Sequence, residues 1–275
     1  MQVVNKSIAI VAGEGDLPFS IKDALNNQGW SVFILAYHGI TPEHLIKDTS
    51  HAWLYLGQVQ KAVEILQHHC IKHIVLVGKF YRPKLINLRL DTLGRKLLYR
   101  LGVNWFGDNA LLTALLEFIQ EQGLVLVKIQ DIIPGLLTQK GRIGTRSPNL
   151  HALEDIEKGI KILKDLSCWD VGQGLAIQGK RVLGIEAAEG TDACITRCGL
   201  LAEQGGLTPK PVYVKMAKVG QSRAIDLPVI GFDTVDALYK AGFQGMGIEA
   251  HSVLVLDLPA LERAIQEREV FLWKF

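Results

Sequence analysis

Residues 182–192 are VLGIEAAEGTD, and the second half of the chain is organised around this stretch. It opens with a short apolar run that is typical of a strand. Three acids then follow at intervals of three residues, namely Glu186, Glu189 and Asp192. Beyond Asp192 the apolar residues have helical spacing. The pattern therefore predicts a strand, an acidic turn and the N-terminus of a helix.

The acidic turn has two interpretations. Gly190 lets the turn be tight, and Thr191 is suited to cap the helix. The free N–H groups of a helix N-terminus attract anions, and carboxylates beside them can hold a hard cation such as Mg²⁺, which then meets a phosphate. Alternatively, Glu189 and Asp192 only complement the helix dipole, as acids in such turns often do. The residues by themselves leave both interpretations open.

Composition places the chain among ordinary globular proteins. Its 275 residues are enough for two domains or for one large one; 48% are hydrophobic and 21% are charged. A formal net charge of +2 gives no basic field that would argue for a nucleic-acid partner. The four cysteines form no zinc-binding pattern, and we expect reduced thiols in a cytosolic protein. No apolar run approaches membrane-spanning length.

In the first half, apolar strand-like runs alternate with helical patterns. The expected strands are residues 7–12, 30–36, 73–77 and 124–129, and the expected helices are 17–28, 58–70, 93–101 and 110–122. Such alternation is typical of a parallel, doubly wound sheet with ligands at the carboxyl ends of its strands. We therefore predict an α/β protein with a Rossmann-like domain at residues 1–131.

The glycine turn after the first strand is a weak dinucleotide signal. Residues 13–18 are GEGDLP, so the third glycine of the dinucleotide fingerprint is missing. The second expected strand is followed by Tyr37 and His38 instead of the acid that would hold a ribose hydroxyl. Gly13 and Gly15 remain candidates for contact with a nucleotide or phosphate, and a tight turn without a ligand is the alternative.

The second half predicts a mixed α/β domain at residues 148–275, joined to the first by a linker at 132–147. Gly179 lies between two apolar runs and indicates a hairpin. In the next strand, residues 211–217, alternation places Tyr213 and Lys215 on one face. Lys215, Lys218 and Arg223 would form a cationic clamp around Asp226, unless this loop simply carries solvated surface charges.

Several short sequence motifs of this chain occur together, and in this order, in one known family. They are GEGDLP at 13–18, GDNALL at 107–112, DVGQ at 170–173, EAAEGTD at 186–192, VKMAK at 214–218 with Gly220 and Gln221, and DLPVIG at 226–231. The chain resembles, along nearly its whole length, the UDP-2,3-diacylglucosamine pyrophosphatases of lipid A biosynthesis that are unrelated to calcineurin-like metallophosphoesterases. The family often has asparagine where Glu14 stands, so contacts to the nucleotide can differ here.

The resemblance implies a hydrolase that splits the pyrophosphate of UDP-2,3-diacylglucosamine into UMP and 2,3-diacylglucosamine 1-phosphate (lipid X), with Mg²⁺ as cofactor. It also implies a cytoplasmic protein attached peripherally to the inner leaflet of the inner membrane, with homodimer formation left open. Two other functions compete with it on the residues alone. One is a nucleotide-sugar oxidoreductase, which the broken glycine fingerprint disfavours. The other is a non-catalytic nucleotide-binding regulator, whose acidic turn would be only a helix cap.

The resemblance and the residue patterns together give the candidate site. Asp226 is the residue expected to be essential, and a role as metal ligand suits an ionised aspartate better than a role as general base. The expected catalytic residues are Asp226, Asp192, Lys215 and Lys218, and the expected metal ligands are Asp226, Asp192 and Glu189. The expected substrate-binding residues are Gly13, Gly15, Gln173, Glu189, Gly190, Thr191, Gln221 and Arg223.

Overall fold

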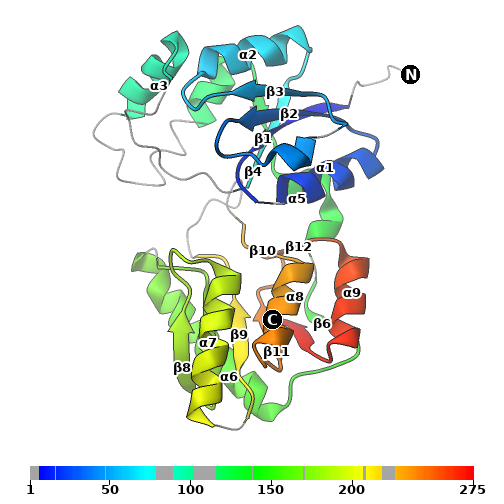
Figure 1. The fold of residues 1–275 in the computed structure, drawn as a ribbon, viewed down its shortest axis with the longest axis vertical. Helices are drawn as coiled ribbons and strands as arrows, with labels where there is room; N and C mark the ends of the chain where they lie inside the picture. The colour runs from blue at the N-terminus through cyan, green and yellow to red at the C-terminus, as the bar shows by residue number, and fades with distance from the viewer. Residues whose placement is uncertain are drawn as a thin grey trace. The chain divides into compact units, whose positions relative to one another are not determined.

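A computed structural model describes residues 6–15, 17–46, 48–78, 89–101, 116–137, 139–169, 171–206, 209–218 and 227–275. The chain divides into two compact units, Met1–Ile133 and Pro134–Phe275, each with its own sheet (Figure 1). The division falls within residues 132–147, the stretch that the sequence assigns to a linker.

The N-terminal unit is built on five parallel strands in the order β3-β2-β1-β4-β5. The strands are β1 (Ser7–Ala12), β2 (Ser31–Tyr37), β3 (His51–Leu54), β4 (His73–Val77) and β5 (Val125–Leu126). The described part of this unit contains α1 (Leu17–Asn27), α2 (Val59–His68), α3 (Thr92–Leu101) and the short α5 (Ile129–Ile132), with the 3-10 turn η1 (Glu43–Ile46). Residues 116–121, within the helix expected at 110–122, are also helical. Figure 1 shows α1 on one side of the sheet and α2 with α3 on the other. The parallel sheet predicted for this half is confirmed.

Two strands of this unit differ from the expectation. β3 was not expected, because its four residues are too few to show a period in the sequence. β5 is only two residues long where a strand over 124–129 was expected. It pairs with His73 and Ile74 at the edge of the sheet, and the chain turns into α5 at Ile129. An apolar run alone does not show where a partner strand stops.

The C-terminal unit contains a six-stranded mixed sheet in the order β6-β13-β11-β9-β7-β8. Its strands are β6 (Gly141–Ile143), β7 (Gly174–Gln178), β8 (Arg181–Ile185), β9 (Val212–Lys215), β11 (Gly245–Ile248) and β13 (Phe271–Lys274). β9, β11 and β13 are parallel, whereas β6 and β7 are antiparallel to their neighbours. A separate parallel pair joins β10 (Val229–Ile230) to β12 (Leu254–Val255). The mixed α/β unit expected for this half is confirmed.

Helices cover both faces of the six-stranded sheet. They are α6 (Leu150–Leu166), α7 (Thr191–Gly205), α8 (Phe232–Lys240) and α9 (Leu258–Glu267), with the 3-10 turns η4 (Pro134–Leu136) and η5 (Ser167–Trp169). Apolar residues of α6 pack with Val212, Val214 and Met216, whereas those of α7, α8 and α9 pack with Tyr213 on the other face. The alternation predicted for this strand is therefore confirmed.

The hairpin predicted around Gly179 is also present. β7 and β8 are antiparallel, and Gly179 and Lys180 form the turn between them. The stretch expected as a linker contains β6, which pairs with β13 and so belongs to the second sheet. All four cysteines are free thiols, and Cys194 and Cys198 are buried. In the part of the chain that the structure describes, no helix has both the length and the apolarity needed to cross a membrane.

Candidate active site

One edge of the C-terminal sheet gathers most of the second-half candidates that the structure describes. β8, β9 and β11 point the same way, because β7 is antiparallel to both β8 and β9. Their carboxyl ends therefore meet at one edge together with the first residue of β7. The register pairs Lys215 with Gly174 and with Ile248, and Glu186 N donates to Gly174 O at 2.8 Å. Such an edge is where open α/β sheets bind their ligands.

The acidic turn forms the entry to α7. Gly190 is the N-cap with φ of 82°, a conformation that residues with a side chain rarely adopt. Thr191 is the first helical residue, so the prediction that it caps the helix is wrong. Its hydroxyl makes contacts with side chains of the site instead of with the N–H groups of the helix. The positive end of the helix dipole lies at this first turn.

Glu186 lies at the centre of a buried hydrogen-bond network. Tyr213 Oη donates to Glu186 Oε2 at 2.8 Å, and Thr191 Oγ1 donates to Glu186 Oε1 at 3.1 Å. Lys215 Nζ lies 3.4 Å from Glu186 Oε2 and donates a short hydrogen bond to Thr191 Oγ1. The threonine hydroxyl thus accepts a hydrogen bond from the lysine and donates one to the carboxylate. Each of these four side chains contacts at least one of the others.

Burial gives this network its strength. The side chain of Lys215 is only 4% exposed and that of Glu186 only 12%. Two opposite charges removed from water attract each other strongly, and each must keep its partner, because an unpaired buried charge is very unfavourable. Burial, and then the negative charge of Glu186, raise the pKa of Tyr213 well above its usual value. Tyr213 therefore remains a hydrogen-bond donor across the physiological pH range.

Glu189 is engaged outside this network. Arg197 Nη2 pairs with Glu189 Oε1 at 2.7 Å, and Ala187 N donates to Glu189 Oε2 at 3.2 Å. The hydrogen bond from Arg197 is the main reason that the pKa of Glu189 is lowered. Each carboxylate oxygen thus has one protein partner, and the metal-ligand role expected for Glu189 stays a prediction.

Three further predicted site residues of this unit, Asp192, Lys218 and Gln173, lie at or near the same edge of the sheet. Asp192 is exposed in the first turn of α7. Lys218 is half-buried three residues beyond the end of β9, and the carbonyl of Gln173 accepts from Met216 N at 2.9 Å beside the network. Gln221, Arg223 and Asp226 lie outside the described residues. Within those residues, no group of three His, Cys, Asp or Glu side chains is placed to hold a metal ion.

Gly13 and Gly15 belong to the N-terminal unit, at the carboxyl end of β1. Gly13 N donates to Val77 O at 2.7 Å, and Gly15 has φ of 90°. A side chain at Gly78 would lie 2.9 Å from the carbonyl carbon of Gly13, so the two turns pack directly against each other. The result is a tight backbone turn at the ligand edge of a parallel sheet.

Sequence reasoning gave no role to Glu186, Tyr213 or Glu249. Glu249 closes the end of β9, because Ala217 N donates to Glu249 Oε2 at 3.1 Å. Tyr213 was expected on the same face as Lys215, and that alternation was the available signal for it. Glu186 opens the acidic stretch, and besides Thr191 its partners are 27 and 29 residues away in the chain. Nothing local in the sequence indicates those contacts.

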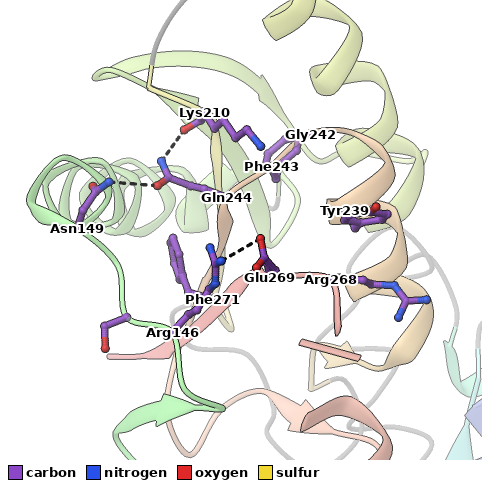
Figure 2. A pocket seen from close by; sticks show the side chains of 11 residues that line it. Arg146, Asn149, Lys210, Tyr239, Gly242, Phe243, Gln244, Arg268, Glu269 and Phe271 are labelled. Carbon is purple, nitrogen blue, oxygen red and sulfur yellow. Dashed lines mark hydrogen bonds and ion pairs between the residues drawn. The ribbon is translucent and has the colours of Figure 1, made fainter. Parts of the chain in front are cut away.

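A cavity of about 420 Å³ lies at the opposite edge of the same sheet, next to the starts of β9, β11 and β13. Several of its polar groups are bonded to one another (Figure 2): Arg146 pairs with Glu269 at 3.0 Å, and Gln244 donates to the carbonyl of Lys210. Arg268 pairs with Asp236 at 2.9 Å. None of the predicted site residues lines this cavity, so the carboxyl edge remains the candidate site.

Comparison with known proteins gives matches along nearly the whole chain. A family model described as the LpxI N-terminal domain matches residues 7–136, and one described as the LpxI C-terminal domain matches residues 139–273. The UDP-2,3-diacylglucosamine pyrophosphatase LpxI of Caulobacter vibrioides is 27% identical over 270 residues, which are 97% of this chain and 96% of that protein.

Solved structures give only distant matches. A UDP-glucose 4-epimerase of Thermotoga maritima, solved with UDP-glucose, is 11% identical with a TM-score of 0.27 and covers 53% of this chain and 42% of its own. The precorrin-6A reductase CobK is 11% identical with a TM-score of 0.29 and covers 96% of this chain and 98% of its own. Similarity at this level supports no argument about fold or function.

Proposed function

This chain belongs to the LpxI family, and we propose that it hydrolyses the pyrophosphate of UDP-2,3-diacylglucosamine to UMP and 2,3-diacylglucosamine 1-phosphate in lipid A biosynthesis. The observation that carries the proposal is the buried lysine beside a helix N-terminus. Lys215 and the first turn of α7 lie together at the carboxyl edge of the C-terminal sheet.

The chemistry of pyrophosphate hydrolysis suits this arrangement. The leaving and attacked phosphates carry negative charge on their non-bridging oxygens, and fixed positive groups stabilise the charge that develops in the transition state. A lysine ammonium has three N–H donors. Lys215 directs donors at Thr191 and Glu186, and we assign the third to a phosphate oxygen. The N-terminus of α7 adds a second fixed positive pole through the helix dipole. Lys218 and Arg223 are proposed to contact the same phosphates.

We propose that Mg²⁺ assists the reaction and that Asp192 and Asp226 hold it. Carboxylate oxygens are the ligands that this ion prefers. Asp192 is exposed in the first turn of α7. When bound, the ion would neutralise charge on the phosphates. Glu189 stays a proposed third ligand, which would bind the ion while Arg197 and the backbone orient its carboxylate. Gln173, Gly190, Gln221 and the turn at Gly13 and Gly15 remain proposed substrate contacts.

A substrate with two acyl chains resides in a membrane, so we propose a cytoplasmic protein that associates peripherally with the inner membrane. Sedimentation with vesicles of anionic phospholipid tests this, and recovery of all the protein in the supernatant would argue against it. Homodimer formation stays a prediction, which light scattering checks.

The decisive experiment measures release of UMP from UDP-2,3-diacylglucosamine by the wild type, Lys215→Met and Asp226→Ala, each with Mg²⁺ or with EDTA. We expect turnover by the wild type, and at least about a 100-fold loss in each variant and in EDTA, because a fixed charge in a water-poor site contributes on the order of 10²–10³ in rate. Lys210→Met is the matched control, since this lysine lies at the opposite edge of the same sheet. It should retain wild-type turnover.

The outcomes separately test the role of Lys215, the need for the metal and the enzymatic function. Turnover that survives in Lys215→Met would remove the lysine from the reaction, and turnover that survives in EDTA would remove the metal. Absence of turnover by folded wild-type protein would exclude the enzymatic function and leave a nucleotide-binding regulator.

A further inference from the structure

Within the described residues, the side-chain hydrogen bonds of Glu186 are all made to other side chains of the protein. One of its oxygens accepts from Tyr213 at 2.8 Å and lies 3.4 Å from the Lys215 ammonium, and the other accepts from Thr191 at 3.1 Å. The residue is buried. A carboxylate whose two oxygens are both bonded to protein groups has little capacity left to bind substrate, so any influence of Glu186 on the reaction passes through the groups that it holds.

Two glycines allow the backbone to approach Glu186 closely. A Cβ atom at Gly174 would stand 2.6 Å from Glu186 Oε2 and would collide with the Tyr213 hydroxyl. A Cβ at Gly172 would collide with the carbonyl oxygen of Glu186. The first residue of β7 therefore packs closely against the hydrogen bond between Glu186 and the fully buried Tyr213.

Lys215 is held from two directions as a result. Its ammonium bonds directly to Thr191 and pairs with Glu186, and Thr191 is itself bonded to Glu186. A lysine side chain has many rotamers in water, and ordering it costs conformational entropy. Here that cost falls on folding rather than on the reaction, so the ammonium is already oriented when substrate arrives.

We propose that Glu186, fixed by Tyr213, is a positioning residue that orients and balances the charge of Lys215 for the reaction. The inference rests on the proposed pyrophosphatase activity, in which Lys215 contacts a phosphate. Glu186 and Tyr213 contribute to the rate only through that lysine. Their removal must then matter when Lys215 is present and cease to matter when it is absent.

A double-mutant cycle tests this coupling. Glu186→Gln, which keeps the shape of the side chain, should lower kcat by at least about 10-fold with a smaller change in KM. In a Lys215→Met background the same substitution should change kcat by less than about 2-fold. Tyr213→Phe keeps the ring and removes only the hydroxyl. It should also lower kcat, by a smaller factor than Glu186→Gln does. Equal losses from Glu186→Gln in both backgrounds, or no loss in the first, would overturn the proposal.

A second readout does not depend on activity. Trinitrobenzenesulfonate labels lysine amines, and mass spectrometry resolves the labelling of each lysine. We expect Lys215 to be labelled at least about 3-fold faster in Glu186→Gln than in the wild type, because its partner charge is gone, while exposed Lys210 is labelled equally in both. Unchanged labelling of Lys215 in a folded variant would show that Glu186 does not hold it. Wild-type protein without turnover, but with the labelling change, would reject the activity and keep the contact.

Discussion

At the scale of single residues, Gly174 is the position where the network is most sensitive to one added atom. Gly174→Ala would push a methyl group against Tyr213 and Glu186. We expect a loss of about 1–3 kcal/mol in the free energy of unfolding, as for other overpacked cores, and a loss of turnover because one of the two side chains must move. Urea unfolding and UMP release measure the two effects.

The control for that substitution is Gly135→Ala, where a Cβ atom would meet nothing within 4 Å. Its free energy of unfolding should change by less than about 1 kcal/mol, and its turnover should stay at the wild-type value. If the two alanine variants behaved alike, close packing at Gly174 would not be what holds the network.

At the scale of elements, α6 holds the β7–β8 hairpin through Asp155. This aspartate is only 1% exposed, and its two oxygens accept from Gly179 N at 2.9 Å and from Lys180 N at 2.6 Å. Asp155→Ala would leave two backbone donors of the turn without their charged acceptor. We expect a loss of about 2–4 kcal/mol in the free energy of unfolding, measured by urea denaturation.

The neighbouring Glu154 is the matched control. It pairs with the side chain of the same Lys180 at 3.0 Å, but both side chains are largely exposed. Exposed ion pairs contribute little, so Glu154→Gln should change the free energy of unfolding by less than about 1 kcal/mol. An equal effect of the two substitutions would mean that the charge of the turn, and not the burial of its acceptor, stabilises the hairpin.

At the scale of the whole molecule, each unit has its own core. In the described residues, the apolar cluster around β1 and β2 draws only on the N-terminal unit, and the two clusters around β9 draw only on the C-terminal unit. We expect residues 134–275 to fold alone, with a single cooperative thermal transition in circular dichroism. A fragment without such a transition would show that this core needs the rest of the chain.

The sequence by itself determined the class of fold and many of the residues at the carboxyl edge of the C-terminal sheet, where the candidate site lies. Alternation every second residue placed Tyr213 and Lys215 on one face of β9, and the acidic stretch predicted a strand that turns into a helix. These features depend on neighbours in the chain, so local patterns report them. Asp226, Gln221 and Arg223 remain predictions from the family resemblance, since they lie outside the described residues.

Only the tertiary structure decided which polar groups meet. β7 runs antiparallel between β8 and β9, and this places Gly174 beside both Glu186 and Lys215. Thr191 could have capped its helix, but the buried lysine and carboxylate nearby bond to its hydroxyl instead. The hydrogen-bonded side chains Tyr213–Glu186, Lys215–Glu186 and Lys215–Thr191 are 24 to 29 residues apart in the chain. Strand order and the need to pair buried charges bring them together, and a local sequence pattern reports neither.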